Sequence, residues 1–94
     1  MDIEQFASIT RNVILDCGLE EFQPTVCFPE RKDVKSLAGV PRDEEHEPIA
    51  LRWAASSAQP EEEYLVAFKC SRIEFKVVRF ERGIREHKVY EVEA

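Results

Sequence analysis

The spacing of apolar residues near the N-terminus predicts an amphipathic helix over residues 2–17. The apolar positions at helical spacing are Ile3, Phe6, Ala7, Val13, Ile14 and Cys17. Thr10 interrupts this stripe. Asp2 is a good N-cap, and Gln5 three residues later completes a capping box. Gly18 is placed to end the helix in a left-handed conformation.

Alternation of apolar and polar residues predicts strands in the second half of the chain. The expected strands are 48–57, 62–70, 73–81 and 84–93. The first of them is the least obvious, because its alanines also favour a helix. Its larger apolar side chains nevertheless recur with period two, at Ile49, Leu51, Trp53 and Ala55.

Short links between these strands predict their register. Ser71-Arg72 and Arg82-Gly83 each fit a two-residue hairpin loop. The expected pairs are Cys70–Ile73, Phe68–Phe75, Val66–Val77, Phe75–Tyr90, Ile73–Val92, Arg79–Glu86, Trp53–Val66 and Leu51–Phe68. They give one apolar row of Leu51, Phe68, Phe75 and Tyr90, and a slip of one residue would reverse the faces.

The remaining segments are shorter and less regular. Residues 24–29 lie between prolines, which favours an edge strand or an extended segment. Residues 32–38 could form a short helix that ends at Gly39. The fold class is therefore α+β in one domain, 1–94. An N-terminal helix packs on one face of a four- to five-stranded antiparallel meander sheet, with an irregular acidic segment at 30–47.

The second face of this sheet is the candidate binding surface, because it is more apolar than a solvated face should be. The candidate partner-binding residues are Leu65, Lys76, Val78, Phe80, Arg85, His87 and Val89. Two alternatives without a binding function remain open. Either the loop 30–47 covers this face, or its apolar side chains are isolated exposed residues. The leading hypothesis is a small non-catalytic binding or regulatory module that contacts a protein partner, with a homodimer as one form of it.

Charge is distributed unevenly along the chain. The net charge is −6, yet residues 69–88 hold seven Lys and Arg against three Glu, so this window carries +4 and the rest −10. Glutamates interleave with the basic residues, which disfavours nucleic acid as a partner. A second hypothesis is an acidic inhibitor or immunity-type protein that neutralises a basic target. Its acidic residues would be Asp43, Glu44, Glu45, Glu47 and Glu61–Glu63.

The segment "DEEHEP" at 43–48 is the densest patch of candidate chemistry. Histidine and carboxylate side chains are suitable metal ligands. Adjacent residues, however, rarely bind one ion together, so a metal site would require His46 and His87 to lie close together in the fold. We therefore expect no metal, no cofactor and no catalytic residue here. A third hypothesis is a small enzyme or ligand carrier with a pocket between helix and sheet. That pocket would be lined by Phe6, Trp53, Phe75 and Tyr90.

The cysteines and the N-terminus bear on the compartment. Cys17, Cys27 and Cys70 are odd in number and far apart, which predicts three buried free thiols in a reducing environment. The N-terminus lacks a secretory pattern, and no apolar run reaches the length of a membrane span. We expect a cytoplasmic protein that does not contact a membrane.

Overall fold

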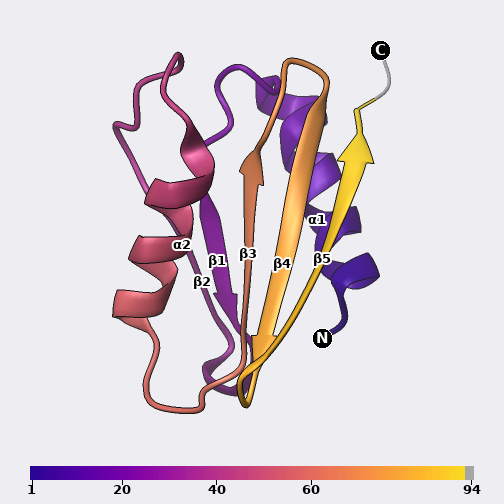
Figure 1. Ribbon diagram of the computed structural model, residues 1–94. Coiled ribbons are helices and arrows are strands. Elements are labelled where there is room, and N and C mark those ends of the chain that lie inside the picture. The colour runs from indigo at the N-terminus through magenta and orange to yellow at the C-terminus, as the bar shows by residue number, and fades with distance from the viewer. Residues whose placement is uncertain (93–94) are drawn as a thin grey trace.

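A computed structural model describes residues 1–92, which form two helices and a five-stranded antiparallel sheet (Figure 1). The elements are α1 (Ile3–Cys17), β1 (Thr25–Phe28), a 3₁₀ turn (Pro29–Arg31), β2 (Asp33–Ser36), α2 (His46–Ser57), β3 (Tyr64–Lys69), β4 (Glu74–Glu81) and β5 (Ile84–Glu91). The strand order in the sheet is β2-β1-β3-β4-β5. The predicted α+β class with an N-terminal helix on an antiparallel sheet is confirmed. Residue 93, expected at the end of the last strand, lies outside the described residues.

The predicted N-terminal helix and its capping box are confirmed. The Asp2 carboxylate accepts from the Gln5 amide at 2.8 Å, and the Gln5 side chain accepts from the Asp2 amide at 2.9 Å. Gly18, at φ 87°, donates to the Ile14 carbonyl and ends the helix as expected, but its ψ of 145° lies outside the left-handed helical region. The buried face differs slightly from the prediction: it contains Phe6, Ala7, Thr10 and Ile14, whereas Val13 and Cys17 are exposed.

The strand predicted at 48–57 is wrong, because this segment belongs to α2. Its buried residues are His46, Ala50 and Ala54, which are four apart as on one face of a helix. The helical repeat of buried positions in this segment is therefore formed largely by small side chains, since two of these residues are alanines. The larger Leu51 and Trp53 are only partly buried and lie beside this face of the helix. Their spacing of two residues arose because they lie on the two sides of the buried face, and it did not indicate a strand.

Residues 24–29 do contain a strand, but the expected edge position is wrong, and so is the helix expected at 32–38. β1 is an interior strand that pairs with both β2 and β3. Pro24 and Pro29 lie just outside its ladder and leave all four strand residues able to donate. The expected helix at 32–38 is instead β2, the edge strand. The 3₁₀ turn and Lys32, at φ 53°, reverse the chain between the two strands.

The register of the last hairpin is confirmed, and that of the preceding one is off by one residue. Phe75 lies opposite Tyr90, and a turn with Arg82 at φ 49° and Gly83 at φ 81° connects β4 to β5. Between β3 and β4, however, Phe68 lies opposite Lys76. The Cys70 amide donates to the Glu74 carbonyl at 3.0 Å, so the loop is one residue longer than predicted.

This slip changes which side of the sheet each apolar residue faces. β3 is buried on both sides, because α1 packs on one face of the sheet and α2 on the other. The core under α1 includes Leu65, Ala67, Phe75 and Val77. The core under α2 includes Val26, Phe28, Val66, Phe68 and Val78. The predicted single row joining Phe68 to Phe75 is therefore wrong, and the molecule has three layers.

Candidate functional site

β5 is the least covered element of the fold. Seven of its eight residues are exposed, and only Tyr90 is partly buried. α1 contacts β5 from one face, whereas α2 packs on β3 and leaves the front of β5 open (Figure 1). The opposite edge strand, β2, has only four residues, half the length of β5. β5 is thus the longer free edge of the sheet.

Two of the sequence-predicted partner residues do not lie on an open face. Leu65 and Val78 are fully buried, Leu65 under α1 and Val78 under α2. Their expected exposure on one surface was wrong, because the β3 register and the second helix were not foreseen. These two residues support the sheet from within.

The other five predicted residues lie together on the α2 side of β4 and β5. Glu47 of α2 pairs with Lys76 at 3.2 Å and with Arg85 at 3.7 Å. Phe80 stacks on the Tyr64 ring, with the ring centroids 4.8 Å apart. His87 and Val89 are exposed. The structure therefore brings these five side chains to one surface, two of them held by an ion pair to α2.

On the α1 side, polar side chains tie β5 to the helix. The Glu4 carboxylate accepts from the Lys88 ammonium at 2.6 Å and from the Tyr90 hydroxyl at 3.0 Å. The hydrogen bond from Lys88 is the main cause that lowers the pKa of Glu4. Burial, followed by the bond to Glu4, raises the pKa of Tyr90 to about 12. These contacts fix the strand without covering its outer edge.

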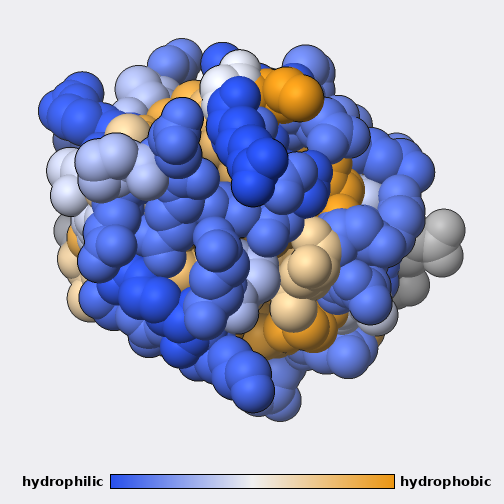
Figure 2. All heavy atoms as spheres, turned by 90° about the horizontal axis from the view of Figure 1, so that it is seen from below, coloured by the Kyte–Doolittle hydropathy of each residue, from blue (hydrophilic) through white to orange (hydrophobic). Residues whose placement is uncertain are grey.

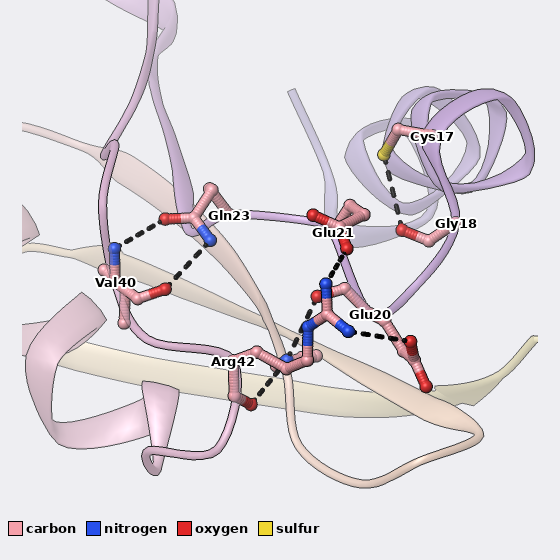
Figure 3. A network of polar contacts seen from close by, with 8 residues as sticks. Cys17, Gly18, Glu20, Glu21, Gln23, Val40 and Arg42 are labelled. Carbon is pink, nitrogen blue, oxygen red and sulfur yellow. Dashed lines mark hydrogen bonds and ion pairs between the residues drawn. The ribbon is translucent and has the colours of Figure 1, made fainter.

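The segment before α2 does not fold over the candidate surface. The Gln23 side chain holds the Val40 backbone through two hydrogen bonds, at 2.9 Å and 3.2 Å (Figure 3). Arg42 pairs with Glu20 and Glu21 (Figure 3). These contacts fasten the segment beside the end of α1, so the alternative in which it covers the second sheet face is wrong.

The "DEEHEP" segment forms the exposed lead-in and first turn of α2. His46 is only 2% exposed, and its Nε2 lies 3.1 Å from the Pro41 carbonyl. Because a carbonyl only accepts, Nε2 carries a proton in this contact, and Nδ1 has no partner among residues 1–92. Within residues 1–92, no hydrogen bond joins His46 to His87. The described residues also contain no group of three side chains suited to a metal ion.

An open cleft of about 830 Å³ lies beside this segment. It is lined by Leu19, Glu20, residues 42–47 and residues 69–73, and side chains of both charges face it. Within residues 1–92, the side chains expected to line a pocket between helix and sheet do not converge: Phe6 and Phe75 are buried in the core under α1, whereas Trp53 packs against the core under α2. Those residues therefore do not line one site.

The expectation of three buried thiols is wrong for two of the cysteines. Cys27 is buried, whereas Cys17 and Cys70 are exposed. Burial is the main cause that raises the pKa of Cys27, and partial desolvation of the thiol raises that of Cys70 although the residue as a whole is exposed. A raised pKa disfavours the thiolate, so neither of these two cysteines has the environment of a nucleophile.

The acidic residues 61–63 are partly used within the fold. Glu62 accepts from Arg31 at 2.7 Å and 2.8 Å, and Glu63 pairs with Arg79 at 2.8 Å. Two of the three glutamates in this run are therefore held in ion pairs within the chain. No signal in the sequence identified the arginine partners, which lie about 16 to 31 residues away.

Comparison with known proteins identifies no relative of this chain. No family model matches it, and no curated protein or solved structure is significantly similar. No helix within residues 1–92 is long and apolar enough to span a bilayer.

Proposed function

We propose that this chain is a small non-catalytic binding or regulatory module, and that β5 with the adjoining side of β4 is its contact surface. The observation that carries the proposal is the exposure of seven of the eight β5 residues. A strand with seven exposed residues keeps most of its side-chain surface available for contact with another molecule. Contact with a partner would bury both its backbone edge and its apolar side chains.

The side chains on this surface suit protein recognition. Val89 is 44% exposed, and Phe80 is partly buried, so both have apolar area that a partner could cover. Arg85 and His87 add polar groups at the same place, which supplies orientation. The acidic-inhibitor hypothesis has less support, because Glu47, Glu62 and Glu63 are engaged in ion pairs within the chain.

Two valines on opposite edges of the sheet give a matched test. Val89 on β5 and Val34 on β2, which is 60% exposed, each receive the same change to Glu. We expect Val89→Glu to abolish capture of a protein partner from an extract of the source cells, because it buries a charge in the contact. Val34→Glu should leave capture at the wild-type level.

Equal capture by both variants would contradict the proposal. Circular dichroism and urea unfolding would verify that both variants are folded. Since both valines are exposed on edge strands, neither change should alter the stability by more than about 0.5 kcal/mol.

A further inference from the structure

The backbone groups of β5 alternate between β4 and the outer edge. The Val92 amide donates to the Ile73 carbonyl at 2.7 Å, and this pair continues the register of Tyr90 with Phe75. In an antiparallel ladder every second residue is hydrogen-bonded to its neighbour strand. Ile84, Glu86, Lys88 and Tyr90 therefore bond to β4. Arg85, His87, Val89 and Glu91 direct their amides and carbonyls outward.

One of these outward groups is already occupied. Arg11 of α1 donates to the Glu91 carbonyl at 2.9 Å. An incoming strand therefore cannot use Glu91 without displacing Arg11. The free part of the edge consists of Arg85, His87 and Val89, and this restricts the register that a partner strand can adopt.

We propose that β5 pairs antiparallel with β5 of a second copy, with His87 opposite His87 on the two-fold axis. This inference rests on the proposed function and names the partner. The outward backbone groups then form three hydrogen-bonded pairs with two bonds each, Arg85 with Val89, His87 with His87, and Val89 with Arg85. The two five-stranded sheets join into one.

Side-chain complementarity supports this register. On the α1 side it places Glu86 opposite Lys88 of the second copy, and by symmetry it does so twice. It also places Ile84, which is 62% exposed, opposite the second copy's Tyr90. The contact thus combines two opposite-charge pairs with burial of an exposed apolar side chain.

Neighbouring registers are disfavoured by like charges or by the Arg11 contact. Moving the axis one residue toward the N-terminus puts Glu86 opposite itself, and moving it one residue toward the C-terminus puts Lys88 opposite itself. The latter shift also brings Glu91 into a hydrogen-bonded pair, where Arg11 holds its carbonyl. Charged side chains on a free edge commonly prevent it from pairing with another strand. On β5, however, these charges form opposite-charge pairs with those of a second copy in one register.

Sedimentation velocity of the full chain over a range of concentrations tests this inference. We expect a monomer–dimer equilibrium for the wild type and a monomer for His87→Pro. The proline removes an outward amide that the monomer does not use, and free edges tolerate proline. His87→Ala, which keeps the amide, is the matched control and should still dimerise.

Charge reversal provides a second series that does not depend on the proline variant folding. Glu86→Lys should weaken the dimer about tenfold, because two attractive pairs become repulsive. Arg79 then keeps Glu63 and Glu81 as partners, so the monomer should remain folded. Adding Lys88→Glu reverses both charges and should restore dimerisation.

A monomer at every concentration would overturn the inference, as would a dimer that neither His87→Pro nor Glu86→Lys weakens. Neither result decides the proposed function, which fails separately if Val89→Glu captures partners as well as Val34→Glu does. The two claims are therefore distinguishable.

Discussion

Tyr90 links the edge strand β5 to α1 through a hydrogen bond from its titratable hydroxyl group. Its hydroxyl donates to Glu4, and its ring stacks on Phe75 with the centroids 5.2 Å apart. The pKa of Tyr90 is raised to about 12, from an ordinary value of about 10. The neutral phenol is thus favoured in the fold relative to the unfolded chain.

This pKa predicts how stability changes in alkaline solution. Because the folded pKa is raised, the contribution of Tyr90 is complete below about pH 10 and is lost as the pH rises to about 12. Tyr90→Phe should therefore unfold with a flatter dependence on pH in this range, as measured by urea unfolding. Tyr64, whose pKa burial also raises, is retained in both proteins. Parallel pH curves for the two proteins would contradict the prediction.

At the residue scale, local interactions were predictable and distant ones were not. The Asp2–Gln5 capping box follows from residues three apart in the sequence. The burial of His46 depends on the Pro41 carbonyl and on the start of a helix that the sequence pattern concealed. The same limit explains why Cys17 and Cys70 were wrongly expected in the core.

At the scale of elements, β3 is the strand that joins the two cores. Leu65 belongs to the core under α1, and Phe68 belongs to the core under α2. We expect Leu65→Ala to lower the free energy of unfolding by about 2 to 5 kcal/mol and Phe68→Ala by about 3 to 5 kcal/mol. Leu15→Ala, at a position 65% exposed, is the control and should change it by about 0.5 kcal/mol or less.

Urea unfolding of the three variants distinguishes this arrangement from a sheet covered on one side only. In a two-layer fold, residues 65 and 68 would face opposite sides, and one of them would tolerate truncation. A loss below about 1 kcal/mol for either Leu65→Ala or Phe68→Ala would contradict the three-layer account.

The two largest errors at this scale have one physical origin, which is a lack of contrast between apolar and polar positions. An alternating pattern shows which side chains of a strand face the core only when the side chains on the other face are polar. In "YLVAF" at 64–68 the side chains on both faces are apolar. A single extra loop residue could therefore reverse the strand without any signal in its pattern. α2 was missed because alanines form its buried face, and a period carried by alanine has little hydrophobic contrast.

At the scale of the whole molecule, two helices cover the sheet unequally. α1 and α2 together enclose β3, and β5 is left at the margin with most of its residues in solvent (Figure 1). Figure 2 shows apolar side chains on the face seen from below as small groups separated by hydrophilic residues. That face has no broad apolar patch.

The candidate surface was partly predictable for the same reason. The alternation in β4 and β5 correctly grouped Lys76, Phe80, Arg85, His87 and Val89, because their hairpin register was set by the Arg82-Gly83 turn. Leu65 was included through the slipped register of β3, and Val78 because α2 was read as a strand. The predicted meander already places the last strand at an edge, but the exposure of β5 could not be inferred while α2 was read as a strand.

Residue-resolved amide hydrogen exchange along β5, recorded by NMR at low and high protein concentration, tests the central claim that the outer edge of β5 is a contact surface. Glu86, Lys88 and Tyr90, whose amides face β4, should be protected at both concentrations. The account predicts that Arg85, His87 and Val89 exchange freely in dilute solution and become protected as the concentration rises. Equally fast exchange of these three amides at both concentrations would contradict pairing of this edge with a second copy.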